Sequence, residues 1–352
     1  YLTGNPQITF FKVVYRRHTN FSMEEIEQSP NGTVKEGGTA SFTISRNGDL
    51  IHKMYFEVDC DKIKLDNQKK GSPHIGHKLL KEVECEIGGQ KIDKHHGHWL
   101  SNWAFLYQPN DRGVETNAGR GSDGRPSFFG ETAGGGSMGS TLFQKTSFNI
   151  LEFSVTSSTI DEGEFGENAG FNQFHIPLQF WFNRNPGLAL PLIALQYHEV
   201  KIIAEFGTNT LLGLDEDSFP DGTIRLFAQY IYLDTDERRR FAQVSHEYLI
   251  EQVQYQQEPN ATIVDLNFNH PVKELIWAGA ADGWHDFPLP AGSTYKLQLN
   301  GHDRFSERDV GYFTRQQVYD YHTGYGGVTY TSAHYDESVG VYSFALKPEE
   351  HQ

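Results

Sequence analysis

The sequence is poor in methionine, in cysteine and in long apolar runs. It holds 3 Met and 2 Cys in 352 residues, and its longest purely aliphatic stretch, Leu188 to Leu195, is interrupted by a proline. A membrane-spanning helix needs roughly 20 apolar residues, so no such helix is predicted, and no signal peptide is visible. Cys60 and Cys85 lie in strand-like stretches with an apolar face, which favours buried free thiols in a reducing compartment over a disulfide.

Positive charge is also scarce. Lys and Arg total 30 against 46 for Asp and Glu, which gives a net charge of −16. A chain of this charge repels a phosphate backbone, so direct binding of nucleic acid is not expected. The abundant residues are 35 Gly, 25 Phe and 17 Tyr, a composition that favours strands and turns over helical bundles. We therefore expect an all-β protein, long enough for two domains.

Strand-like runs recur between clusters of Gly, Asn and Asp. The clearest is residues 82–93, where apolar Val83, Cys85 and Ile87 alternate with glutamates before Gly88-Gly89, a pattern that predicts a hairpin with one wet face. An Asn47-Gly48 turn signal separates two further runs. The other expected strands cover residues 8–17, 40–46, 54–60, 151–155, 174–183, 197–206, 223–234, 246–256, 261–270, 272–279, 293–301 and 339–348.

Two segments break the strand pattern. Residues 108–172 form a Gly-rich insertion, with nine glycines in residues 111–140, and predict long loops at one end of a barrel. The second segment, residues 234–243, is charged and helix-compatible. In it we expect a solvated connector with local ion pairs rather than an anion site, formed by Arg238, Arg239 and Arg240 with Asp234, Asp236 and Glu237.

Two stretches of the second half repeat stretches of the first. Residues 296–305 parallel residues 84–93, and residues 340–348 parallel residues 175–183, which predicts two similar barrels in tandem. We place the first domain at residues 1–240, with the insertion inside it, and the second at residues 241–352. Because nothing in the second half matches the strands after Asn183, and the chain starts without methionine, we expect a fragment that is cut at its N-terminus and whose second barrel is incomplete.

The segment from Lys91 to Trp103 contains the one candidate metal site. His96 and His98 would share a face if this stretch were a strand. The cupin pattern fails here, because the spacing from Gly89 is one residue off and no glutamate occurs between Ile87 and Val114. We therefore expect solvated histidines at a strand end, with no catalytic residues and no cofactor, since hydrolase, P-loop and Rossmann signatures are also absent.

Three sequons mark candidate glycan acceptors, at Asn20, Asn31 and Asn260. The low cysteine content argues against secretion, and so against glycosylation along the secretory route.

Long strings spread along the chain point to one family. They are YLTGNPQITFFKVVYRRHTNFSME, ISRNGDLI, EIGGQKIDKH, PGLALPLIALQYHEVK, LDTDERRRFAQVSHEYLIEQ, LNFNHPVKELIWA, LNGHDRF and YSFALKPEEHQ. The chain resembles, through these strings, the major capsid proteins of nucleocytoplasmic large DNA viruses, especially the algal-virus and mimivirus-like groups. In the family's hairpin string only His95 matches, whereas His96 and His98 fall where the family varies.

The resemblance implies a structural protein with a double jelly-roll fold of two eight-stranded barrels. It also implies homotrimers that form pseudo-hexagonal capsomers, an icosahedral shell assembled in the host cytoplasm, and contacts with neighbouring capsomers, minor capsid and penton proteins. An internal viral membrane would lie beneath the shell, and the apolar stretch 188–195, Trp181 and Trp277 would serve core or subunit contacts. Two other classes stay open: a carbohydrate-binding jelly-roll module and a cupin-like metal enzyme.

Overall fold

The computed structural model describes residues 19–59, 75–107, 173–212, 219–244, 246–258, 261–279, 289–324, 328–330 and 335–351. The strands expected at residues 8–17 and 151–155, the insertion at 108–172, Cys60 and Asn260 lie outside these residues. Cys85 is a buried free thiol, as expected.

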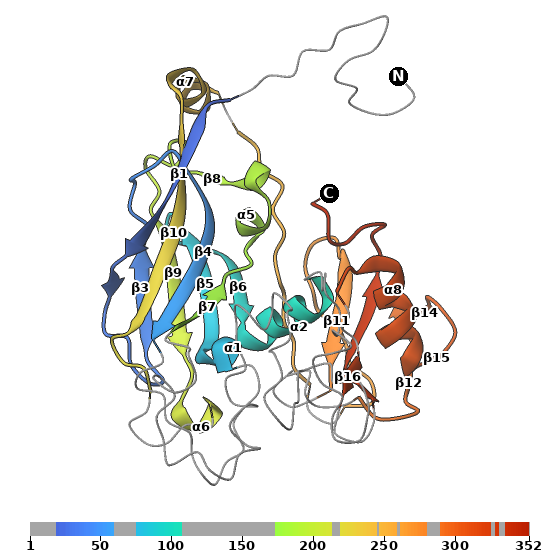
Figure 1. Ribbon diagram of the computed structural model, residues 1–352. Coiled ribbons are helices and arrows are strands. Elements are labelled where there is room, and N and C mark those ends of the chain that lie inside the picture. Colours follow the sequence, from blue (N-terminus) through green and yellow to red (C-terminus); the bar gives the residue numbers. More distant parts are fainter. Residues whose placement is uncertain are drawn as a thin grey trace, which may run out of the picture.

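The first part of the chain forms two antiparallel sheets (Figure 1). One sheet has the order β1 (Phe21–Gln28), β10 (Ile224–Leu233), β4 (Leu50–Asp59), β7 (Gln173–Pro177), and β8 (Leu190–Pro191) also pairs with β4. The other has the order β2 (Pro30–Asn31), β3 (Thr39–Thr43), β9 (Val200–Phe206), β5 (Leu80–Ile87), β6 (Gln90–His96). Apart from the two-residue β2 and β8, each sheet holds four of the described strands, which is the strand number of an eight-stranded jelly roll.

The core lies between these two sheets. Side chains on β9 alternate strictly between buried and half-buried, as the two-residue period of a strand requires when one face is covered. Phe42 of β3 meets Phe56 of the opposite sheet edge-to-face, with ring centroids 5.4 Å apart, and Phe56 in turn meets Phe206 at 6.3 Å. All three rings are fully buried, and such aromatic pairs add about 0.5–1.5 kcal/mol each beyond the burial of their area.

The Asn47-Gly48 turn signal marks a corner between the sheets rather than a hairpin. β3 and β4, on either side of it, belong to opposite sheets, and Gly48 is not among the glycines with positive φ. A Cβ on Gly48 would stand 2.9 Å from Cβ of Tyr230. The glycine is therefore needed for close packing and not for a hairpin turn.

The hairpin predicted at residues 82–93 is confirmed. β5 pairs with β6, and Gly88 and Gly89 between them have φ of 61° and 80°. Val83 and Cys85 are buried, whereas the glutamates beside them are half-buried, which is the expected wet face. The strand expected at 223–234 is β10, and that expected at 197–206 is β9, which begins only at Val200.

Helices occupy several corners, including one place where a strand was expected. The run 174–183 is a strand only to Pro177 and ends in α5 (Trp181–Arg184), because the Asn183 side chain accepts from Phe180 N and donates to the His52 carbonyl, closing a helical turn. The other helices of this part are α1 (Ile75–Leu79), α2 (Gly97–Tyr107), η2 (Pro186–Leu188), α6 (Asn209–Leu212) and α7 (Thr235–Gln243). None of the helices in the described residues is both long and apolar enough to cross a bilayer.

α7 is the charged connector expected at residues 234–243. Asp234 caps it by accepting from Glu237 N at 3.0 Å, and Arg238 pairs with Asp49 at 2.9 Å. Arg238 thus contacts a carboxylate of the sheet corner rather than one of the nearby acidic residues of its own segment.

The C-terminal part is built from short antiparallel pairs. β11 (Glu274–Ala278) pairs with β18 (Val339–Ser343). The strand expected at 272–279 is confirmed as β11, whereas the run 339–348 is a strand only to Ser343. The smaller pairs are β12 (Thr294–Tyr295) with β15 (Arg308–Asp309), β13 (Gln298–Leu299) with β14 (His302–Asp303), and β16 (Val328–Tyr330) with β17 (Tyr335–Glu337). η3 (Tyr312–Gln316) and α8 (Gln317–Tyr321) pack against β18, and η3 also contacts β15. Asn300 and Gly301 between β13 and β14 have φ of 52° and 77°, so this hairpin repeats the first one, as predicted.

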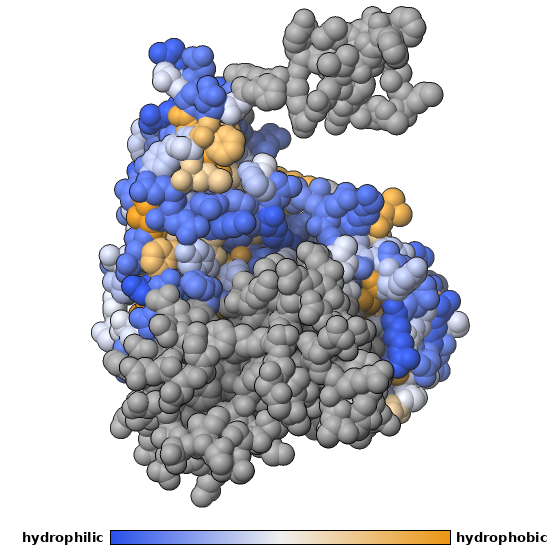
Figure 2. Space-filling view, viewed as in Figure 1, coloured by the Kyte–Doolittle hydropathy of each residue, from blue (hydrophilic) through white to orange (hydrophobic). Residues whose placement is uncertain are grey.

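The prediction of strands at residues 246–256 and 261–270 is wrong. The described residues of both runs form no strand. The two runs are connected by hydrogen bonds that involve glutamine side chains, whereas a pair of strands would be connected by backbone hydrogen bonds. Gln254 accepts from Asn269 N at 2.8 Å, and Gln256 donates to the Asp265 carbonyl at 2.8 Å. Several apolar side chains of these runs are consequently exposed, among them Leu249 and Ile263. Figure 2 shows the described surface on one face as mostly hydrophilic, with separate apolar patches.

Candidate functional site at the junction of the two parts

Helix α2 leaves the first sandwich directly after β6 and reaches the C-terminal part (Figure 1). Its last residues, Leu106 and Tyr107, are buried in one cluster with Val318, Val339 and Val341. Burial of each large apolar side chain contributes about 1.5–3 kcal/mol relative to exposure. We call the contacts of β6, α2 and α5 with residues 251–351 the junction.

The junction also satisfies the end of α2. The last carbonyls of a helix have no partner within it. Gly324 N donates to the Leu106 carbonyl at 2.8 Å, and Thr323 Oγ1 lies 3.1 Å from the Tyr107 carbonyl oxygen. The C-terminal part therefore supplies the cap of a helix that belongs to the first.

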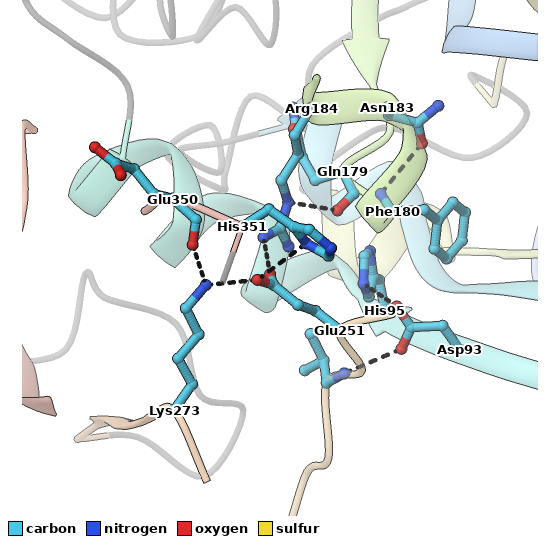
Figure 3. A network of polar contacts seen from close by, with 11 residues as sticks. Asp93, His95, Gln179, Phe180, Asn183, Arg184, Glu251, Lys273, Glu350 and His351 are labelled. Carbon is cyan, nitrogen blue, oxygen red and sulfur yellow. Dashed lines mark hydrogen bonds and ion pairs between the residues drawn. The ribbon is translucent and has the colours of Figure 1, made fainter. Parts of the chain in front are cut away.

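Glu251 is the centre of a charged network in the junction (Figure 3). Its Oε2 lies 2.9 Å from Nη1 of Arg184 at the end of α5, and its Oε1 contacts Nζ of Lys273 and lies 3.5 Å from Nδ1 of His351. Lys273 also donates to the Glu350 carbonyl at 2.6 Å. Burial lowers the pKa of Arg184, and the carboxylates of Glu251 and Asp93 act against that shift. The network joins four separate stretches of the chain.

Asp93 on β6 binds the segment 246–258, which we call the connecting segment, beside this network (Figure 3). Its Oδ1 accepts from Val253 N at 3.0 Å, and its Oδ2 lies 2.9 Å from Nε2 of His95. The His95 ring stacks on Phe180, with centroids 4.5 Å apart. His95, the histidine that matches the family string, is thus a buried packing residue.

His322 is the other buried histidine of the junction. It follows α8, and its side chain has no exposed surface. Its Nε2 lies 3.3 Å from Glu274 Oε2, and its Nδ1 lies 3.5 Å from Glu349 Oε1. Its ring and that of Tyr107 of α2 meet edge-to-face, with centroids 4.9 Å apart.

The structure brings the candidate metal residues His96 and His98 together. Their rings stack with centroids 5.1 Å apart, and Tyr255 lies against both at 4.6 and 4.8 Å. His96 ends β6, whereas His98 lies in the first turn of α2, so they do not sit on one strand face as supposed. Glu82 lies 3.4 Å from His96 Nδ1 but is also paired with Lys94.

Protonation of this histidine pair is disfavoured. Burial lowers the pKa of His96, and burial together with the neighbouring His96 lowers the pKa of His98 to about 4. Over the described ranges, no group of three or more His, Cys, Asp or Glu residues is placed to hold a metal ion. The expectation of solvated histidines at a strand end is wrong, because both side chains are half-buried and packed against Tyr255. As metal ligands they remain two imidazoles without a third ligand among the described residues.

Two candidate glycan acceptors are visible at the surface. Asn20 and Asn31 are both exposed, and the Asn31 amide donates to Thr43 Oγ1 at 3.1 Å. Exposure is necessary for modification but does not show it, so both stay predictions.

Sequence reasoning missed the junction residues altogether. Glu251, Lys273, His322 and Glu349 lie far apart along the chain and in no common motif. The one available signal was the presence of Glu251 inside a strand-like apolar run, where a buried charge requires a partner.

Comparison with known proteins now gives the class. A jelly roll of this strand order, joined to a second β-rich part, is the architecture of double jelly-roll capsid proteins. Residues 9–234 match the family model described as the major capsid protein N-terminus, and residues 237–284 match that of the large eukaryotic DNA virus major capsid protein.

The relatives agree. The chain is 48% identical to the major capsid protein of Pyramimonas orientalis virus, covering 100% of this chain and 84% of the relative. It is 35% identical to that of Paramecium bursaria Chlorella virus 1, covering 99% and 79%. A chain of the quasi-atomic model of the PBCV-1 virus capsid superposes with a TM-score of 0.65 at 32% identity, covering 98% of this chain and 82% of that one.

The chain belongs to the family of major capsid proteins of large eukaryotic DNA viruses. Its role is structural, as a capsid component of the virion. The comparisons support this role and neither the carbohydrate-binding module nor the cupin-like enzyme.

Proposed function

We propose that three copies of the protein assemble into a pseudo-hexagonal capsomer and that capsomers tile an icosahedral shell. A chain with two jelly-roll units offers two similar walls, so three chains around an axis present six. The observation that carries the proposal is the junction, because α2 and the Glu251 network hold the two parts of the chain against each other. A pseudo-hexagonal capsomer requires that the two jelly-roll units of each chain keep a fixed position relative to each other.

We further propose that the division into domains falls at residue 240, with units at residues 1–240 and 241–352. Support comes from the change of family model between residues 234 and 237 and from α7, which separates the last strand of the first sandwich from the connecting segment. The second unit would be a second jelly roll.

The proposed partners are those of a shell subunit: neighbouring capsomers, minor capsid proteins and penton proteins. Assembly would take place in the host cytoplasm, around an internal viral membrane that the subunit itself does not cross. The net charge of −16 supports a subunit without direct contact to the genome. No enzymatic activity and no cofactor are part of this proposal.

The mass of the protein in solution tests the trimer. The protein expressed from its complete reading frame should sediment as a particle of three chain masses and remain so on dilution into the micromolar range. A single chain mass at high concentration would contradict the proposal.

A separate measurement tests the non-enzymatic role. Protein dialysed without chelator should retain far less than one zinc or nickel ion per chain, and changing His96 and His98 to alanine should not alter that amount. Stoichiometric metal that these changes remove would favour the metal-enzyme alternative.

A further inference from the structure

The side chain of His322 lies between two carboxylates inside the junction. Both of its ring nitrogens face acidic oxygens, Glu274 Oε2 at 3.3 Å and Glu349 Oε1 at 3.5 Å. The imidazole is fully buried, and the carboxylate side chains are 10% and 20% exposed. The ring itself is therefore out of contact with bulk water.

The number of protons on the ring decides whether this arrangement is favourable. A neutral imidazole carries one N–H and presents a lone pair on its other nitrogen, so one of the two carboxylates would face an acceptor. The imidazolium carries two N–H groups and suits both. With a neutral ring, two negative charges would also share a poorly hydrated site with no cation between them.

The same cluster holds the two parts of the chain together. Glu349 accepts from Thr323 N at 2.6 Å, and its Oε2 lies 2.8 Å from Thr323 Oγ1, which also reaches the Tyr107 carbonyl. Gly324, the next residue, donates to the Leu106 carbonyl. His322 therefore lies at the point where β11, the C-terminal segment and the end of α2 meet.

We propose that His322 is a proton-dependent latch, whose imidazolium form closes the junction and whose neutral form loosens the C-terminal part from α2. Three elements pack against the ring, and each supplies one titratable group from the described residues: Glu274 from β11, Glu349 from the C-terminal segment and Tyr107 from α2. The other residues of the cluster that holds Tyr107 carry no titratable group: they are Leu106, Val318, Val339 and Val341, with Trp103 and Ile276 packed against them.

The direction of the pH dependence follows from the surroundings of the ring. Burial by itself lowers the pKa of His322, but the neighbouring carboxylates of Glu274 and Glu349 raise it, and the net shift is upward from the ordinary 6.5. A histidine with a raised pKa in the folded state stabilises that state fully below about 6.5, and the stabilisation is lost as the pH rises through the folded value. The latch is closed on the acidic side and opens toward alkaline pH.

Amide hydrogen exchange at Thr323 and Gly324 tests the latch. Their protection, corrected for the intrinsic rate, should fall several-fold between pH 6 and pH 8.5, whereas amides of β9 in the first sandwich keep theirs. His322→Gln should remove the pH dependence at Thr323 and Gly324. The matched control is His175→Gln, which breaks a pair with Glu57 on a half-exposed face of the sandwich and should leave the dependence intact.

Protection at Thr323 and Gly324 that does not depend on pH in the unchanged protein would overturn the proposal, as would a dependence that survives His322→Gln. If that variant does not fold, NMR titration of the His322 ring in the unchanged protein decides. A midpoint above 6.5 that drops in Glu349→Gln supports the latch, and a midpoint below 6.5 rejects it.

Discussion

Two tyrosines on β10 differ in how much their hydroxyl groups contribute to stability. The Tyr230 ring is fully buried, and its hydroxyl donates to the Ser45 carbonyl at 2.6 Å and lies 3.2 Å from Gln28 Oε1. Tyr232, two residues on, donates to Glu24 at the surface. Removal of a buried partner leaves a polar group unsatisfied, whereas water replaces a partner lost at the surface.

Tyr230→Phe is therefore expected to lower the free energy of unfolding by about 1–3 kcal/mol. The matched change Tyr232→Phe should leave it nearly unchanged. Denaturant titration followed by circular dichroism measures both. Equal effects of the two changes would show that burial of the Tyr230 hydroxyl is not what stabilises this corner.

The acid side of the stability profile should depend on His98. Its folded pKa of about 4 lies below the ordinary 6.5, so the folded state resists protonation and loses stability as the pH falls from about 6.5 toward 4. His98→Gln should flatten this part of the profile, measured as denaturation midpoint against pH. The pH dependence that His98 contributes is opposite in sign to that of His322. An acid slope that stays unchanged in His98→Gln would contradict the role given to His98.

At the level of single residues, the sequence predicted which side chains lie near each other better than it predicted their chemical surroundings. His96 and His98 do meet, as a two-residue spacing suggested, but through the break between β6 and α2. The partners that define their environment, Tyr255 and Glu82, come from a distant segment and from the neighbouring strand. No local pattern contains that information.

The first residue of helix α2 must be glycine. A Cβ on Gly97 would lie 2.2 Å from the His77 carbonyl oxygen and 2.5 Å from that of Leu80. These are backbone atoms of α1 and the start of β5, which cannot move aside as a flexible side chain can. The close approach places α2 so that its far end reaches the C-terminal part.

Gly97→Ala has two opposing effects on stability, a gain in helix propensity and a steric clash with these carbonyl oxygens. Alanine favours a helix by about 0.5–1 kcal/mol over glycine, but overpacking costs about 1–3 kcal/mol or more, so we expect net destabilisation. The control is Gly311→Ala before η3, where the nearest atom is a side-chain oxygen of Asp309 at 3.2 Å and the change should be neutral or mildly stabilising. Thermal melts of both variants measure the difference. Stabilisation by Gly97→Ala would contradict the packing argument.

The elements that were predicted correctly are those specified by local pattern. Alternation plus a glycine pair is enough for the β5–β6 hairpin, and Asn300-Gly301 is enough for its repeat. The runs 246–256 and 261–270 show the limit, because alternation reveals which side chains share a face but not whether a backbone partner lies beside the strand. The end of the run 174–183 as α5 depends on Asn183 bonding to His52, a contact across the fold.

For the whole molecule, the junction determines how the two parts work as one subunit. Its apolar half comes from α2 and its charged half from Glu251, which faces Arg184, Lys273 and His351. Removal of the central carboxylate would leave cations together in a site that is mostly covered. Loss of a half-buried ion pair lowers the free energy of unfolding by more than loss of an exposed pair and by less than loss of a fully buried pair.

Glu251→Gln is accordingly expected to lower stability by about 1–3 kcal/mol and to separate the unfolding of the C-terminal part from that of the first sandwich. Glu350→Gln serves as the control. Among the described residues the Glu350 side chain pairs with exposed Lys347, so its loss should cost about 0.5 kcal/mol or less. Differential scanning calorimetry shows whether one transition becomes two. A single unshifted transition in Glu251→Gln would show that the network does not couple the two parts.

Electron cryo-microscopy of the purified protein tests most directly whether it builds a capsid tile. Protein expressed from the complete reading frame should give particles with threefold symmetry, a pseudo-hexagonal outline and two jelly-roll lobes per chain. Particles that contain a single chain, or that close with another symmetry, would contradict the proposed assembly.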